Sequence, residues 1–365
     1  MQLYLHIPFC HRICPYCSFY KHTPGNTDLR AFISALGEEA AYYAKKLQPK
    51  KINTLYLGGG TPSMLSRTLL RELQNQLNTH FDLSDLKEFT FEANPATFDL
   101  KKAQYFKEMG ITRISLGIQS FDNEVLKTLG REHTREEAQQ TVPLLRQAGI
   151  PQINIDLMFS IPGQSIESWR DTLESAIALQ PDHISAYNLT YEEDTDFIKK
   201  FTTGEYTDDP DQNAEFYHLA HELLTEAGYE HYETSNYAKK GAKSTHNKSY
   251  WQGAQYLGLG PSAVSTIDHT RWKNLPDTAG YIKQINTVGH AQTEIENLTD
   301  EDFRIERMAL MLRTTEGLPM NVFKTSEHER VQTLITEGLA VINNDHFILT
   351  PAGNPLVDSI VEHIL

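Results

Sequence analysis

The chain has 365 residues, 39% of them hydrophobic, and a formal net charge of −15. This length predicts a large first domain followed by a smaller one, and the acidic balance argues against a polyanion-binding surface, so we expect no nucleic-acid partner. No stretch approaches the roughly 20 apolar residues that cross a bilayer, and no basic region with a sustained apolar run marks the amino terminus. We therefore expect a cytoplasmic protein without a transmembrane segment, whose contact with membranes is at most peripheral and through a partner protein.

The first half of the chain alternates short β-branched runs with longer helical patterns. The predicted strands are 3–7, 52–57, 88–92, 113–118, 152–158 and 183–189. The predicted helices between them are 28–46, 64–80, 100–109, 123–148 and 165–179. Near-continuous apolar strands that alternate with helices are typical of a parallel sheet. Because six repeats fall short of an eight-stranded barrel, the sequence predicts an α/β fold with a partial (βα)6 barrel.

The second half divides into two parts. A turn-rich segment near 202–210 predicts a boundary, so we expect a barrel over 1–205, a connecting region over 206–297 and a small domain over 298–365. The last part predicts helices over 300–314 and 327–338, a hairpin over 340–349 and a terminal helix from residue 351. This order is similar to a winged helix, which is an α+β domain. Its acidic composition is unsuited to reading a DNA groove, so we expect a structural or protein-binding role.

Cys10, Cys14 and Cys17 are the only cysteines of the chain, and they follow the first predicted strand. Thiolates favour iron–sulfur clusters, zinc and copper(I). A [4Fe–4S] cluster usually takes four thiolates, so three leave one iron open to a substrate or cofactor. A structural zinc site needs four ligands, and His6 or His11 would have to complete it. The odd count disfavours a disulfide framework, and we favour the cluster.

Polar residues recur where the predicted strands end. The carboxyl ends of parallel barrel strands meet at one rim, where barrel proteins build their sites. The residues that we expect at this rim are Gly58, Gly59, Gly60, Thr61, Glu92, Gln119, Asp156, Tyr187 and Asn188. Each alone has a structural alternative, such as a tight turn or a helix cap. Together with three clustered thiols, they predict a functional site.

Several motifs make the resemblance specific. They lie at 4–17, 58–63, 91–95, 115–121, 129–133 and 154–158. On these stretches the chain resembles the radical S-adenosylmethionine enzymes of the oxygen-independent coproporphyrinogen oxidase family and, within that family, the haem chaperones of the HemW type. One departure is Ser160, which stands where the family usually has glycine.

The resemblance implies a set of cofactors and ligands. Cys10, Cys14 and Cys17 would hold a [4Fe–4S] cluster whose fourth iron binds S-adenosylmethionine. Residues that match cofactor-contacting positions are Tyr4, Tyr16, Gly59, Gly60, Thr61, Glu92, Gln119, Arg131 and Asp156. The carboxylates suit an ammonium or ribose hydroxyls, and Arg131 suits the cofactor carboxylate. The resemblance also implies a homodimer.

Two functions follow from the resemblance. The first is a haem chaperone that binds haem and transfers it to acceptor proteins of unknown identity. The second is an oxygen-independent coproporphyrinogen III dehydrogenase, but those enzymes carry a further cysteine where this chain has Phe19. The segment from His246 to Trp251 matches the H-N-x-x-Y-W motif of the chaperones, which favours the first.

That motif implies haem contacts. Imidazole is a common axial ligand of haem iron, so the resemblance assigns haem binding to His246, while Tyr250 and Trp251 pack on the porphyrin. The alternative is a packed loop in which His246 makes only a structural hydrogen bond.

Overall fold

Parallel pairing of six consecutive strands organises the structure, which is a computed structural model that describes residues 1–49 and 51–365. Each strand pairs with the next in the chain, from β1 to β6. These strands are β1 (Gln2–Ile7), β2 (Thr54–Gly59), β3 (Glu88–Ala93), β4 (Arg113–Gln119), β5 (Gln152–Phe159) and β6 (His183–Asn188). Consecutive parallel order requires a crossover after every strand. The predicted partial (βα)6 barrel is confirmed.

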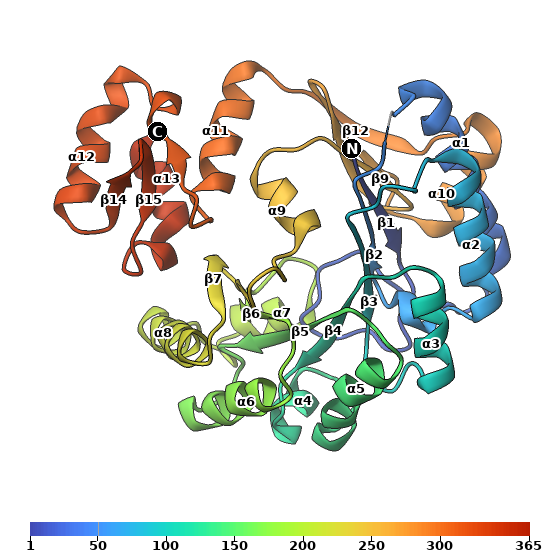
Figure 1. The fold of residues 1–365 in the computed structure, drawn as a ribbon, viewed down its shortest axis with the longest axis horizontal. Helices are drawn as coiled ribbons and strands as arrows, with labels where there is room; N and C mark the ends of the chain where they lie inside the picture. The colour runs from blue at the N-terminus through green and yellow to red at the C-terminus, as the bar shows by residue number, and fades with distance from the viewer. Residues whose placement is uncertain (50) are drawn as a thin grey trace.

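Helices provide these crossovers and cover the outer face of the curved sheet (Figure 1). They are α1 (Leu29–Leu47), α2 (Arg67–His80), α3 (Leu100–Glu108), α4 (Asn123–Thr128), α5 (Arg135–Gln147) and α6 (Ile166–Ala178), with the short 3-10 helix η1 (Pro62–Met64) before α2. Two further helices, α7 (Asp196–Thr202) and α8 (Pro210–Glu226), follow β6. The apolar sides of the helices and the sheet form one large hydrophobic cluster.

The prediction of one helix over 123–148 is wrong, because the structure has two helices with a loop between them. Gly130 adopts a left-handed conformation, with φ of 67°, which ends α4 as glycine commonly does. Thr134 then starts α5 with a reciprocal capping box to Glu137. The break has a functional consequence, since it places Arg131 on a loop.

Residues 206–297 extend the sheet at both edges. The strands β7 (Glu230–Glu233) and β8 (Asn236–Ala238) add to β6, and β9 (Tyr256–Leu259) pairs in parallel with β1. Beyond β9 lie β10 (Val264–Ile267), β11 (Thr270–Asn274) and β12 (Gln292–Asn297), and the helices of this region are α9 (Thr245–Trp251) and α10 (Thr278–Val288). Residues 206–297 therefore belong to the same sheet as the barrel. The domain boundary expected after residue 205 stays a prediction.

The last residues form a smaller unit with its own hydrophobic cluster, set apart from the barrel core (Figure 1). It contains α11 (Asp300–Met311), β13 (Leu318–Pro319), α12 (His328–Thr336), β14 (Ala340–Asn343), β15 (His346–Leu349) and α13 (Val357–Ile364), with 3-10 helices η2 (Met320–Val322), η3 (Thr325–Glu327) and η4 (Asn354–Leu356). The winged-helix-like prediction is confirmed, although η4 precedes the terminal helix, which begins later than expected. Across 1–49 and 51–365, no helix combines the length and apolarity that a membrane span needs.

A buried carboxylate fixes the added strands to the barrel. Glu39 of α1 is fully buried and accepts hydrogen bonds from the Gly260 amide at 2.8 Å, the Asn274 side chain at 2.7 Å and the Tyr281 hydroxyl at 2.6 Å. Burial raises the pKa of the Glu39 carboxyl to about 7, although these three donors oppose the shift. One side chain thus joins α1 to the β9–β10 turn, β11 and α10.

Replacing Glu39 with glutamine is expected to lower the free energy of unfolding by about 1–3 kcal/mol, because the amide nitrogen would face one of the three donors. Equilibrium urea denaturation measures the change. Glu38→Gln, at the exposed neighbouring position of the same helix, is the control and should change stability by less than about 0.5 kcal/mol. Equal stability of both variants would contradict this role for Glu39.

Candidate functional site

The carboxyl ends of β1 to β6 surround a cavity of about 530 Å³. This is the end at which barrels place their sites. Of the residues that the sequence assigns to the cluster and cofactor, those that line the cavity are Cys10, Cys14, Cys17, Tyr16, Gly59, Gly60, Thr61, Glu92, Gln119, Arg131 and Asp156. The structure therefore brings together side chains from all parts of the first half of the chain.

The three cysteines lie on the loop that follows β1. Backbone bonds hold this loop against the barrel: the Cys10 amide donates to the His22 carbonyl at 3.0 Å, and the His22 amide donates to the Pro8 carbonyl at 2.8 Å. The Thr61 hydroxyl donates to the Cys10 sulfur at 3.5 Å, and the Arg131 guanidinium donates to the Cys14 sulfur at 3.7 Å. Each of these two thiols thus has its own polar partner at the cavity wall.

The donor set fits a cluster. In residues 1–49 and 51–365, no three side chains of His, Cys, Asp or Glu converge on a single-ion site. A [4Fe–4S] cluster does not need such convergence, because each thiolate binds a different iron. Burial raises the pKa of the Cys10 and Cys17 thiols, so a bound metal is needed to keep them as thiolates.

The turn after β2 packs closely against the end of β1 and therefore needs glycine. Gly59 has φ of 101°, a conformation that favours glycine. A Cβ on Gly59 would collide with the His6 ring, and one on Gly60 would lie 2.7 Å from the carbonyl oxygens of Ile7 and Phe9. These glycines let the turn pack on the end of β1, which places Thr61 beside Cys10.

Glu92 is the carboxylate on β3. Its side chain accepts hydrogen bonds from the Tyr56 hydroxyl at 2.7 Å and from the Gly59 amide at 3.0 Å. Burial raises the pKa of Glu92 to about 7; Asp156 adds to the rise, while the two donors oppose it. Near neutral pH this carboxyl is therefore divided between its charged and neutral forms.

Asp156 is the second carboxylate, on β5. It accepts from the Ser115 hydroxyl at 2.8 Å and from the Asn154 amide at 2.7 Å. Burial raises the pKa of Asp156, and these donors counteract the rise. Asn154 and Asp156 are two positions apart, so they share the inward face of the strand.

Arg131 brings positive charge to the cavity from the loop between α4 and α5. Its guanidinium donates to the Asn94 side chain at 2.7 Å and to the Gly117 carbonyl. The Arg131 Nε atom is buried and has no acceptor among the described residues. A buried guanidinium nitrogen without a partner is costly, and a ligand carboxylate would satisfy it.

Two backbone positions near the rim are strained. Gln119 has φ of 69° at the end of β4, beside a register shift against β5, and such irregularities redirect side chains near sites. Ser160 has φ of 61° just after β5. The left-handed conformation accounts for glycine at this position in the resembled family.

Tyr4 is the one predicted cofactor residue that does not line the cavity. Its hydroxyl bonds to His6 Nδ1 at 2.9 Å, and its ring lies 5.9 Å from the Tyr56 ring. Tyr4 therefore lies deeper in the barrel, behind Tyr56. Tyr56 and Asn94 also line the cavity, although no role is predicted for them from the sequence. Thr54, Tyr56 and Gly58 stand at every second position of β2, so Tyr56 shares their inward face.

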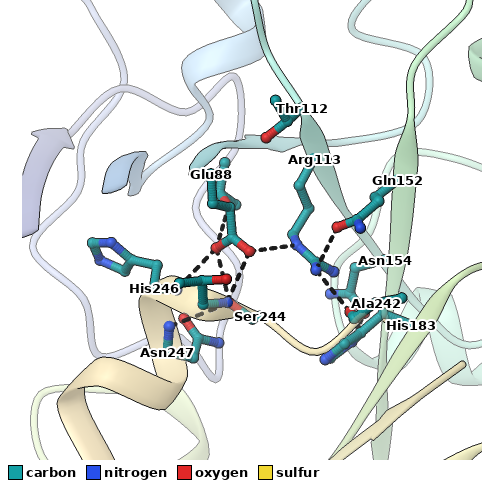
Figure 2. A network of polar contacts seen from close by, with 12 residues as sticks. Glu88, Thr112, Arg113, Gln152, Asn154, His183, Ala242, Ser244, His246 and Asn247 are labelled. Atoms are coloured by element: carbon teal, nitrogen blue, oxygen red, sulfur yellow. Dashed lines mark hydrogen bonds and ion pairs between the residues drawn. The ribbon is translucent and has the colours of Figure 1, made fainter. Parts of the chain in front are cut away.

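The H-N-x-x-Y-W motif lies at the opposite end of the barrel, at the amino ends of the strands. Figure 2 shows His246 on one side of Glu88 and Arg113 on the other, and these two charged residues are the first of β3 and β4. His246 is 1% exposed, with its Nδ1 atom 2.7 Å from the Thr54 hydroxyl and its Nε2 atom 3.1 Å from the Tyr250 hydroxyl. Burial lowers the pKa of His246 to about 4. Both ring nitrogens are thus engaged inside the protein.

The family is established by comparison. Residues 4–176 match the model of the Radical SAM superfamily. The structure superimposes on coproporphyrinogen III oxidase (HemN) from Escherichia coli, described as a radical SAM enzyme, with a TM-score of 0.85 over 100% of this chain and 89% of that chain. At 23% sequence identity this likeness shows the fold. The superfamily match includes the cysteine loop and, together with this fold, identifies a radical SAM protein.

Curated relatives narrow the family. The chain is 34% identical to the heme chaperone HemW of Lactococcus lactis subsp. lactis (strain IL1403), over 99% of this chain and 96% of the relative. It is 37% identical to the heme chaperone HemW of Escherichia coli (strain K12), over 73% of this chain and 70% of the relative. The chain belongs to the HemW family, which confirms the resemblance drawn from the motifs.

Changing Cys10, Cys14 or Cys17 to serine, one at a time, is expected to reduce iron and sulfide per chain to background after anaerobic reconstitution, because the cluster already has one thiolate fewer than the usual four. Ser18→Ala, at an exposed position of the same loop, is the control and should retain full iron content. A cysteine variant with wild-type iron and sulfide would remove that cysteine from the ligand set.

Proposed function

We propose that this protein is a haem chaperone that binds haem and transfers it to acceptor proteins, in a compartment that keeps thiols reduced. It would carry a [4Fe–4S] cluster on Cys10, Cys14 and Cys17 and bind S-adenosylmethionine in the cavity beside it. When bound, the cluster supplies one-electron reduction of the cofactor sulfonium, and the protein supplies position and electrostatics. The observation that carries the proposal is near full-length similarity to proteins named heme chaperones.

The cavity supports the cofactor part of the proposal. Arg131 offers an unpartnered Nε to the cofactor carboxylate. Glu92 and Asp156 offer acceptors to its amino group and ribose hydroxyls. Thr61, Gln119 and the turn at Gly59 and Gly60 complete the wall, and Tyr16 packs beside Phe197, with ring centroids 6.2 Å apart.

A coproporphyrinogen III dehydrogenase is the second candidate, favoured by the shared fold with HemN. Phe19 speaks against it. This side chain lines the cavity and is 67% exposed, at the position where the resembled dehydrogenases have a cysteine. A phenyl ring supplies neither a thiol nor a proton at the cavity mouth.

Haem contacts at His246, Tyr250 and Trp251 are part of the proposal. Because His246 is buried with both nitrogens bonded, haem ligation requires α9 to move and the Tyr250 hydroxyl to release Nε2. The Trp251 indole N–H is buried and has no acceptor among the described residues, which leaves one donor available to a haem propionate.

Anaerobic protein with a reconstituted cluster is given reductant, coproporphyrinogen III and many equivalents of S-adenosylmethionine per chain. It is expected to form no protoporphyrinogen. Chromatography of porphyrins and 5′-deoxyadenosine in one run measures this. The HemN enzyme in the same buffer is the positive control. Protoporphyrinogen that accumulates over several turnovers would replace the chaperone proposal with the dehydrogenase.

His246→Gln is expected to weaken haem binding at least tenfold and to change the haem absorption spectrum, because an amide is a poor iron ligand while its size and polarity suit the buried site. Haem titration followed by absorbance gives both values. His363→Ala, at an exposed position on α13, is the control. Unchanged affinity and spectrum in His246→Gln would remove His246 from the haem site.

A further inference from the structure

The two ends of the barrel are connected through Tyr56. Its hydroxyl donates to Glu92 at 2.7 Å in the cofactor cavity, and its ring lies 5.0 Å from the His246 ring at the other end. On β2, Thr54 contacts His246, and the turn at Gly58 and Gly59 contacts Glu92. Tyr56 lies between these two positions on the strand. One side chain of β2 therefore touches both the motif helix and the cavity carboxylate.

His246 is itself held firmly. The Glu88 carboxylate accepts from the His246 amide at 3.0 Å, the Thr245 amide at 2.8 Å and the Ser244 hydroxyl at 3.1 Å (Figure 2). Arg113 lies 3.3 Å from the same carboxylate, and both charged side chains are almost fully buried. These contacts fix the start of α9 on β3, so the His246 ring has a set position against Tyr56.

We infer that α9 positions Glu92 through Tyr56: His246 holds the Tyr56 ring, and the Tyr56 hydroxyl holds Glu92 in the orientation that binds the cofactor. The inference rests on the proposed function only for the identity of that cofactor. Tyr56 and His246 are positioning residues in this inference. Tyr56 reaches the cavity wall, but its hydroxyl already donates to Glu92, and His246 does not line the cavity.

A consequence for haem follows from the same contacts. If His246 turns Nε2 toward haem iron, it leaves the Tyr250 hydroxyl and the face of Tyr56. Tyr56 then loses its support, and Glu92 loses a donor that favours its charged form. Haem capture at His246 should therefore weaken S-adenosylmethionine binding, and by linkage the cofactor should weaken haem binding by the same factor.

The test measures the Kd of S-adenosylmethionine by calorimetry on anaerobic protein with full cluster content. Tyr56→Phe keeps the ring on His246 and removes the hydroxyl, so the Kd should rise about tenfold, the usual effect of losing a hydrogen bond to a charged group. His246→Gln, which lacks the ring, should also raise the Kd. Tyr43→Phe is the control, because the Tyr43 hydroxyl is buried without an acceptor among the described residues and lies on α1.

The pH dependence separates positioning from general destabilisation. Tyr56 on β2 contacts Glu92 directly, and the other ionisable groups that interact electrostatically with it are Asp156 on β5, Tyr4 on β1 and Cys17 on the cysteine loop. The Tyr56 hydrogen bond lowers the pKa of Glu92, so its removal raises that pKa. Because the ionised carboxylate is the better acceptor, the rise of cofactor affinity through pH 7 should move to higher pH in Tyr56→Phe and stay in place in Tyr43→Phe.

The outcomes are distinct. A wild-type Kd and a wild-type pH profile in Tyr56→Phe would overturn the inference. A wild-type Kd in His246→Gln would show that α9 does not position Glu92. Haem that binds through His246 without changing the cofactor Kd would also overturn it. If the wild-type protein binds no haem, the proposed function fails, and the two variants still decide whether Tyr56 positions Glu92.

Discussion

Glu88 carries a carboxylate that is almost completely removed from water, and its charge is balanced by Arg113 and by donors at the start of α9. Removing one partner of such a buried pair costs about 3–5 kcal/mol, because it leaves an uncompensated charge. Arg113 also donates to Gln152 and to the Ala242 carbonyl, both at 2.7 Å. The pair therefore joins β3, β4, β5 and the segment that leads into α9. It lies at the end of the barrel formed by the amino ends of the strands.

From this end of the barrel, two chains of side-chain contacts run to the cofactor cavity. One passes from His246 by way of Tyr56 to Glu92. The other passes from His183 through Asn154, whose Oδ1 atom lies 2.6 Å from the His183 Nδ1 atom, to Asp156. Alternate residues of each strand point inward, so a polar interior follows from polar residues at every second position. Both cavity carboxylates are held by groups that belong to the barrel interior.

The order and type of the barrel elements could be predicted because each depends on local periodicity, and the rim residues followed from parallel topology alone. The break at Gly130 could have been predicted, because a glycine that ends a helix and the Thr134 to Glu137 capping pattern are both visible in the sequence. The place of α9 could not be predicted, since Glu88 and His246 are 158 positions apart and no short motif encodes that contact. The motif allows a packed loop at His246 as well as a haem site, but it does not show which end of the barrel it occupies.

The far end of α9 also has contacts outside the barrel, made by partly exposed side chains. Lys248 pairs with Glu316, and the Gln252 amide donates to the same carboxylate at 3.1 Å. Glu316 lies between α11 and β13, within the small C-terminal unit. The helix is therefore a tether between that unit and the barrel interior. A protein that docks on the C-terminal unit and displaces it would therefore move α9, and with it His246, without contacting His246.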